Sequence, residues 1–83
     1  VRGADLLVGV VGAELDLLLI KRGRRIGVEV KRADAPTLTP SMRIALADLE
    51  LAKLLVIYPG KQRYSLAERV TVVPARDLAT GIL

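Results

Sequence analysis

Two strand-like runs on either side of a short basic turn constrain the fold of this 83-residue chain more than any other feature. The runs are Ala13–Ile20 and Arg25–Lys31, and the segment between them contains Gly23, which can take the positive φ of a tight turn. A two-residue loop of Arg22 and Gly23 makes the numbers of opposed residues sum to 45. A three-residue loop would send acids and leucines to the same side, so the pattern predicts an antiparallel hairpin with a loop of two or four residues.

This register has a chemical consequence for three charged residues. It places Asp16 opposite Glu29, and Lys31 on the same face as Glu29, because alternate residues of a strand point to the same side. Carboxylates that face each other across a ladder repel and destabilise the sheet. The pair therefore indicates a cation site. The chain has no histidine and no cysteine, which leaves oxygen ligands and favours Mg2+ or Mn2+.

The other face of the same hairpin is expected to belong to the core. It would carry only apolar side chains, and Gly27 on the acidic face would leave room for another group to approach the backbone. The expected core residues are Leu15, Leu17, Leu19, Ile26, Val28 and Val30.

The rest of the chain predicts further strands and two helices. Thr39 and Pro40 are typical of a helix N-cap and first turn, and apolar residues from Met42 onward recur at helical spacing to about Leu51. Pro59–Tyr64 is expected to be a turn. The resulting order is β-β-β-α-β-β-α in an α/β fold with a mixed central sheet. The remaining expected elements are strands at 4–11, Lys53–Tyr58 and Val70–Val73, and a helix at Ala75–Thr80.

Charge and composition limit the class of protein. The net charge is +4, and basic residues near the acidic pair favour a phosphate-rich partner; the alternative is a solvated hairpin tip. Without histidine or cysteine, zinc fingers, disulfides and Ser-His or Cys-His catalysis are excluded. No apolar run reaches the roughly 18 residues of a membrane span, and no signal peptide is evident, so we expect a cytoplasmic protein with no membrane partner. The residues expected to contact nucleic acid are Arg22, Arg24, Arg25 and Arg32.

Asp16 followed by Glu29-Val30-Lys31 resembles the motif of the PD-(D/E)XK nuclease superfamily. The order of elements is also similar to that restriction-endonuclease-like core, apart from a leading helix. A closer resemblance, over nearly the whole chain, is to the uncharacterised nuclease-like C-terminal domain of bacterial and archaeal AAA-type ATPases. The segments that carry it are Gly12–Asp16 and Gly27–Pro36. It implies that residues 1–83 are a single domain, the C-terminal part of a longer ATPase.

The resemblance also implies roles for individual residues. Asp16, Glu29 and the backbone carbonyl of Val30 would bind the metal, with Glu14 as an extra ligand. Lys31 would orient the attacking water or stabilise charge on the phosphate. These roles make the chain a candidate metal-dependent endonuclease with DNA as its partner.

The sequence departs from the superfamily pattern at several places. Leu15 stands where proline is common, and Gln62 and Tyr64 do not match the spacing of the glutamine and tyrosine found in some exonucleases. The leading helix and the phosphate-binding loop of the ATPase are not matched within these 83 residues.

The same residues also allow other interpretations. Lys31 can form an ion pair with Glu14, and Glu29 with Arg25 or Arg32, in a purely structural role. The domain would then be a DNA-binding or dimerisation module of the ATPase with little or no activity. A third hypothesis is a pure oligomerisation domain, because the chain is small and 52% apolar.

Overall fold

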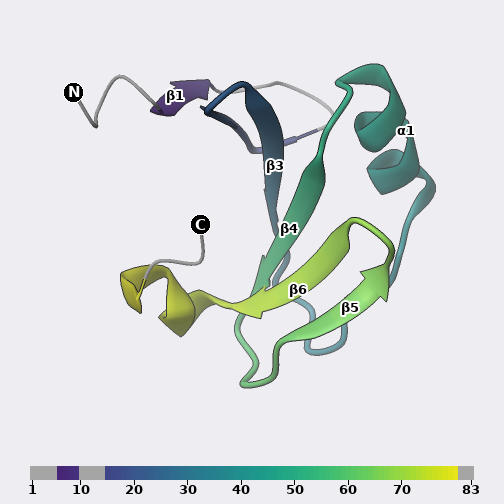
Figure 1. Ribbon diagram of the computed structural model, residues 1–83. Coiled ribbons are helices and arrows are strands. Elements are labelled where there is room, and N and C mark those ends of the chain that lie inside the picture. The colour runs from purple at the N-terminus through teal and green to yellow at the C-terminus, as the bar shows by residue number, and fades with distance from the viewer. Residues whose placement is uncertain (1–5, 10–14, 81–83) are drawn as a thin grey trace.

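The computed structural model describes residues 6–9 and 15–80, with the side chains of residues 15–78. They form a mixed β-sheet, an α-helix and a terminal 3₁₀ helix (Figure 1). In chain order the elements are β1 (Leu6–Gly9), β2 (Leu17–Lys21), β3 (Arg24–Val30), α1 (Pro40–Asp48), β4 (Lys53–Tyr58), β5 (Tyr64–Ala67), β6 (Val70–Pro74) and η2 (Ala75–Thr80). No helix in this part of the chain is long and apolar enough to cross a membrane.

The six described strands lie in the order β1-β2-β3-β4-β6-β5. Neighbours are antiparallel from β1 to β3, parallel from β3 through β4 to β6, and antiparallel again between β6 and β5. The predicted α/β fold with a mixed sheet is therefore confirmed. The parallel pairing of β3 with β4 is confirmed as well, and α1 lies in the long connection that a parallel pair requires.

The predicted order of elements is only partly correct, because it lacks β5 and the last helix is of the 3₁₀ type. β5 is four residues long and pairs with β6 through an irregular register between Ser65 and Ala67. The Ser65 hydroxyl donates to the Ala67 carbonyl at 2.8 Å. So short a strand has too little periodicity to be recognised without its partner. A six-residue helix likewise gains little from the cooperativity that favours longer α-helices.

The β2–β3 hairpin has a two-residue loop, the shorter of the two lengths that the sequence allows. Lys21 pairs with Arg24, and the register continues to Leu17 opposite Val28, so paired residue numbers sum to 45 as predicted. Arg22 and Gly23 have φ values of 53° and 79°. Two successive positive φ angles are typical of the type I′ turn, which follows the right-handed twist of the strands.

The predicted sorting of side chains is wrong at Leu15 and Val30. Leu17 and Leu19 pack with Ile26 and Val28 as expected, but Leu15 packs on the opposite face, beneath α1. The chain bends at Asp16, immediately before β2, and this bend interrupts the alternation. Val30, at the end of β3, is 57% exposed.

The space above Gly27 is filled by the protein itself. A Cβ atom at this position would lie 2.7 Å from a methyl carbon of Leu51 and 3.0 Å from one of Leu15. The predicted room for another group at Gly27 is therefore taken by two core side chains, because Leu15 turns to this face.

α1 begins as predicted and ends earlier than predicted. The Thr39 hydroxyl accepts a hydrogen bond from the Met42 N–H at 3.3 Å, and Pro40 occupies the first turn. The helix ends at Asp48 rather than Leu51. Glu50 then takes a left-handed φ of 51°, which reverses the chain and lets Leu51 enter the core.

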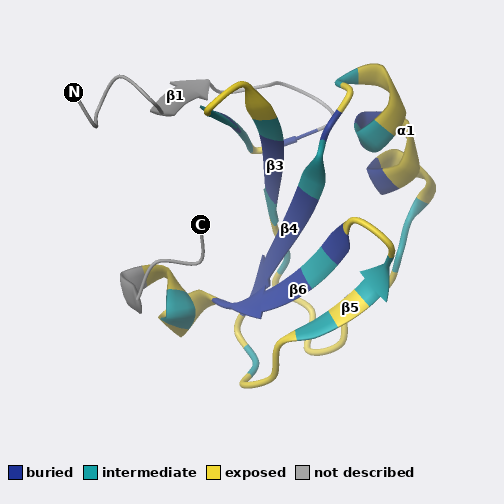
Figure 2. Ribbon diagram, in the orientation of Figure 1, coloured by how far each residue is buried: buried dark blue, intermediate teal, exposed yellow. Residues whose placement is uncertain are grey.

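Two apolar clusters lie on the two faces of the sheet, and Figure 2 shows the buried residues concentrated in β4 and β6. The cluster beneath α1 includes Met42 and Ala45 of the helix, with Leu54, Val56 and Val72 of the sheet. The second cluster includes Leu55, Ile57 and Val73 from alternate positions of the same central strands. Because the central strands are covered by apolar residues on both faces, charged residues of these strands lie at the two ends of the sheet.

Candidate functional site

Glu29 and Lys31 lie next to each other at the carboxyl end of β3. The Lys31 Nζ atom is 3.2 Å from the Glu29 Oε2 atom, and the two side chains are 40% and 13% exposed. The backbone N–H of Lys31 donates to the Ile57 carbonyl at 2.8 Å, which anchors this end of β3 against β4. The strand thus presents an ammonium and a half-buried carboxylate at one fixed place.

Asp16 reaches the same end of β3 from the chain before β2. Its Oδ2 atom accepts a hydrogen bond from the Val30 N–H at 2.8 Å, and its own N–H donates to the Val28 carbonyl at 3.2 Å. The predicted ladder pair of Asp16 with Glu29 is not formed, because the chain bends at Asp16 and the carboxylate binds the β3 backbone instead. Asp16, Glu29 and Lys31 are nevertheless gathered around two successive peptide units.

The structure decides between some of the alternative ion pairs predicted for these residues. Glu29 forms its ion pair with Lys31, and not with Arg25 or Arg32. Glu14, the predicted extra ligand and the other candidate partner of Lys31, lies outside the described residues.

The donor set at this end of β3 consists of carboxylate oxygens and one backbone carbonyl. Asp16 and Glu29 each use one oxygen, in the bonds to the Val30 N–H and to Lys31, and each keeps a second. The carbonyl of an extended residue points to the same side as its N–H, so the Val30 carbonyl is expected on the edge of β3 where the Val30 N–H binds Asp16. Within residues 6–9 and 15–80, no group of three or more acidic side chains has the spacing of a metal site. Two carboxylates, a carbonyl and several waters nevertheless fit the ligands that magnesium accepts.

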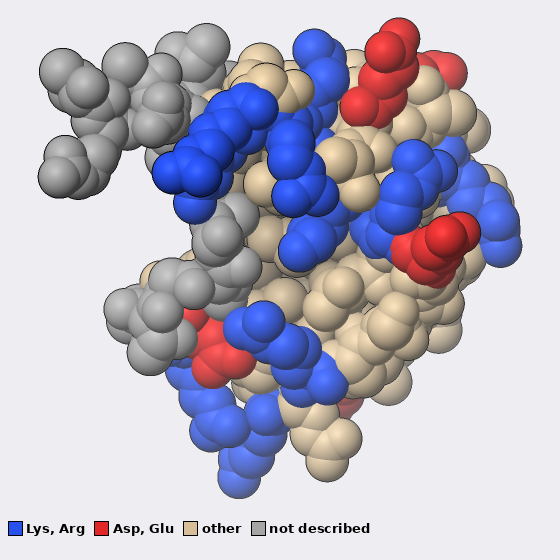
Figure 3. Space-filling view, viewed as in Figure 1, with Lys and Arg blue, Asp and Glu red and all other residues tan. Residues whose placement is uncertain are grey.

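The predicted basic rim around the acidic residues is not formed as expected. Arg22, Arg24 and Arg25 lie at the hairpin turn and the amino end of β3, four or more residues before Glu29, which is about 13 Å along a strand. Only Arg32 follows directly after Lys31 at the carboxyl end. In the view of Figure 3, lysine and arginine side chains gather over the upper part of the molecule, where the hairpin turn and the start of β4 lie. The basic residues are thus divided between the two ends of the sheet.

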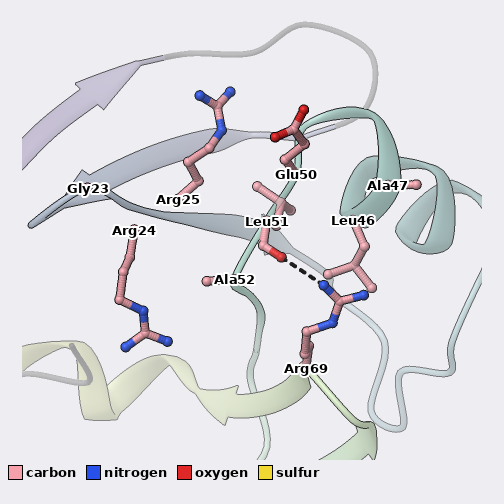
Figure 4. Close-up of a pocket in the computed structure, with 9 residues that line it drawn as sticks. All are labelled: Gly23, Arg24, Arg25, Leu46, Ala47, Glu50, Leu51, Ala52 and Arg69. Carbon is pink, nitrogen blue, oxygen red and sulfur yellow. Dashed lines mark hydrogen bonds between the residues drawn. The ribbon is translucent and has the colours of Figure 1, made fainter.

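A hollow lies at the amino end of the sheet, between the hairpin, the end of α1 and the turn that joins β5 to β6 (Figure 4). Its volume is about 580 Å³, and its charged residues are Arg24, Arg25, Arg69 and Glu50. The Arg25 Nε atom donates to the Leu49 carbonyl at 2.6 Å, and the Arg69 Nη1 atom donates to the Leu51 carbonyl at 3.2 Å. Two guanidinium groups are therefore fixed on the chain that leaves α1.

Arg69 and Glu50 are site residues that the sequence does not predict. Arg69 lies in the turn after β5. Because the sequence does not predict β5, it does not predict the position of Arg69 either. The helical pattern places Glu50 on a solvated helix face, but the helix ends before it. No local sequence signal marks either residue, because the hollow is formed by segments far apart in the chain.

A smaller hollow of about 170 Å³ lies at the carboxyl ends of β3 and β4. Lys31 and Arg32 line it together with the apolar residues Val30, Ile57 and Ala75. Lys31, the ion-pair partner of Glu29, lines this hollow, and in open α/β sheets ligands bind outside the carboxyl ends of parallel strands. The position of the Asp16–Glu29–Lys31 cluster therefore agrees with a general property of such sheets.

Comparison with known proteins shows relatives of undescribed function. An uncharacterized protein of Mycobacterium tuberculosis and one of Mycobacterium bovis are each 47% identical to this chain over 68 residues. The match covers 82% of this chain and 15% of each relative, so most of either relative lies outside it. No solved structure matches the chain. The family model described as "Domain of unknown function (DUF4143)" matches residues 10–78, and the chain therefore belongs to that family.

Proposed function

We propose that this domain is a nuclease-fold module of the PD-(D/E)XK type, which hydrolyses DNA phosphodiester bonds with Mg2+ or Mn2+. The observation that carries the proposal is the gathering of Asp16, Glu29 and Lys31 around the last peptide units of β3. Carboxylates can hold a metal that polarises a phosphodiester and activates water, and an ammonium can stabilise charge that develops on the phosphate. The domain would belong to a longer ATPase, and the matched segment of 15% in each relative supports a module within a longer chain.

The metal would be held by the second oxygens of Asp16 and Glu29 and by the Val30 carbonyl. Magnesium keeps several water ligands and usually takes only one or two carboxylates, so this donor set is sufficient. The hydrogen bond from the Val30 N–H fixes the orientation of the Asp16 carboxylate before any ion binds. When bound, the ion would polarise the phosphodiester and favour ionisation of a water molecule.

Lys31 would act on the substrate rather than on the metal. Its ammonium is held by Glu29, but the side chain as a whole is 40% exposed, so the ammonium has further N–H groups to donate outward. A lysine at this place would orient the attacking water or stabilise negative charge on the phosphate.

The first test is manganese binding by calorimetry, comparing the wild-type chain with Asp16→Asn. The asparagine oxygen can still accept from the Val30 N–H, so the backbone contact is retained while the charge is lost. We expect binding to weaken at least tenfold in Asp16→Asn. The matched control is Asp48→Asn, an exposed acid at the end of α1, which should leave binding unchanged. Wild-type protein that binds no manganese would refute the metal site.

A second candidate function is a DNA-binding or dimerisation module of the ATPase with little or no catalysis. It is favoured by the lack of a third acidic side chain near Asp16 and Glu29 among the described residues. Plasmid nicking with manganese separates the two functions. We expect wild type to nick the plasmid and Lys31→Met to nick it at least tenfold more slowly while still binding manganese. Salt-dependent DNA binding by wild type without any nicking would favour the module instead.

A further inference from the structure

The hollow at the amino end of the sheet contains fixed cationic groups that the proposed catalytic cluster does not use. The Nε–H group of Arg25 donates to the Leu49 carbonyl, and an Nη1–H group of Arg69 donates to the Leu51 carbonyl. A guanidinium carries five N–H donors, so each group keeps donors for a partner. Because these bonds already restrict the side chains, an oxyanion would bind them with a smaller loss of conformational entropy.

The positive charge of the three arginines at this end of the sheet is only partly offset by the described part of the chain. Its ion pairs are Lys31–Glu29 and Arg63–Asp77, both away from the hollow. Glu50 lines the hollow but lies beyond ion-pair distance of every described arginine and lysine, although Figure 4 shows its carboxylate on the same side as Arg25. The Arg24 side chain forms no hydrogen bond or ion pair with another described residue.

The register of the strands extends this charge across the sheet. Lys21 and Arg24 are directly opposed on β2 and β3, and like charges in that position destabilise a sheet. Lys53, the first residue of β4, pairs with Ile26 and thus lies on the same face as Arg24, two positions along. The three cations extend over two strand spacings, about 10 Å. One strand of DNA advances about 3.4 Å along the axis per phosphate, so this length is enough to contact more than one phosphate of a backbone.

We propose that the amino end of the sheet is a second contact surface, separate from the carboxylate cluster, that binds the phosphates of a nucleic-acid backbone. This inference rests on the proposed function for the choice of nucleic acid as the anion. Figure 4 shows Arg24 and Arg25 pointing away from each other, so the charge is spread around the end of the sheet rather than focused on one point. A polymer of regularly spaced phosphates matches that distribution better than a single phosphate group. Arginine is also suited to phosphate because its planar fork donates two parallel hydrogen bonds.

The test is fluorescence anisotropy with a labelled 20-base-pair DNA duplex and the 83-residue chain in EDTA, with salt varied from about 50 to 200 mM. Metal-free conditions separate this surface from the carboxylate cluster. We expect Arg24→Gln to weaken binding roughly three- to tenfold and to reduce the slope of log K against log salt by about 0.9, the value for one lost phosphate contact. The Arg24 side chain makes no bond within the described residues, so this variant should fold normally.

Glu50→Gln provides a test of opposite sign. Removing the acid from the rim of the hollow should tighten DNA binding about two- to fivefold, because a repulsive charge near the phosphates is lost. Lys61→Gln is the matched control: it removes one exposed positive charge from the segment between β4 and β5, outside the hollow. We expect its affinity to stay within twofold of wild type.

Three outcomes would overturn the inference. The first is equal weakening by Arg24→Gln and Lys61→Gln, which would indicate only general charge attraction. The second is DNA binding that neither Arg24→Gln nor Glu50→Gln alters. The third is no DNA binding together with binding to phosphatidylserine vesicles that Arg24→Gln weakens, which would assign the surface to a membrane. A different result would separate the two proposals. If Arg24→Gln and Glu50→Gln change DNA affinity as expected but the wild-type chain binds no manganese, the second contact surface is supported and only the catalytic proposal is refuted.

Discussion

Gly27 illustrates how a single residue reflects the packing of distant segments. It lies in the middle of β3, where the side chains of Leu15 and Leu51 cover its Cα atom. Both leucines are almost fully buried, so neither can move aside without disturbing the core beneath α1. Glycine at this position therefore allows Leu15 and Leu51 to pack directly against the backbone of β3.

Gly27→Ala should destabilise the domain by about 1–2 kcal/mol, because a Cβ atom 2.7 Å from a Leu51 methyl carbon forces the core to shift. Urea unfolding monitored by circular dichroism gives this free-energy change. Gly23→Asn is a suitable comparison: nothing lies within 4 Å of a Cβ there, and asparagine tolerates the positive φ of 79°. A Gly27→Ala protein as stable as the Gly23→Asn protein would show that the leucines can adjust freely.

Among the structural elements, α1 shows which boundaries are set locally and which are set by tertiary contacts. Its start depends on Thr39 and Pro40, which are adjacent in sequence and sufficient to define a cap. Its end depends on Arg25, 24 residues away, whose side chain binds the Leu49 carbonyl. Cations near a helix C-terminus also interact favourably with the helix dipole.

Thr39→Ala should lower the free energy of unfolding by about 1 kcal/mol, because the Met42 N–H loses its side-chain acceptor at the first turn. Thermal and urea unfolding would both report the loss. Thr39→Ser keeps the hydroxyl and should remain within about 0.5 kcal/mol of wild type. Equal destabilisation by both substitutions would point to the lost methyl group instead of the cap.

The same distinction explains how much of this molecule could be predicted from its sequence. The positive φ of Gly23, the β2–β3 register and the bounds of β4 follow from nearby residues, and these predictions are confirmed. β5, the position of Leu15 and the separation of the arginines from Glu29 depend on contacts between distant segments. The ion pair of Lys31 with Glu29 is not predicted by the sequence. Predicting it would require knowing that the chain bends at Asp16, which removes the residue expected opposite Glu29.

At the scale of the whole molecule, the carboxylate cluster and the arginine-lined hollow lie at opposite ends of the sheet. The carboxylate cluster lies where β3 ends, and the arginine-lined hollow lies where β3 begins, about 13 Å away along the strand. The strands between them are buried on both faces by apolar residues. Two functions at such separated places should respond independently to substitution.

A double-mutant cycle with Asp16→Asn and Arg24→Gln tests this independence. Sites more than about 7–10 Å apart without shared partners usually show additive effects. We expect Asp16→Asn to leave metal-free DNA affinity within about twofold, and Arg24→Gln to leave manganese affinity within the same range. Coupling stronger than about threefold in either assay would instead indicate that both ends contribute to one site.

The irregular pairing of β5 has a consequence for how copies of this domain meet one another. A regular outer strand offers its unpaired N–H and C=O groups to any other extended chain, and this is a common route to aggregation. Here β5 is only four residues long and its register shifts between Ser65 and Ala67, so it offers no long regular edge. The border formed by β5 is thus unsuited to continuing the sheet into a neighbouring molecule. Stacking of copies into a continuous sheet is therefore discouraged along that border.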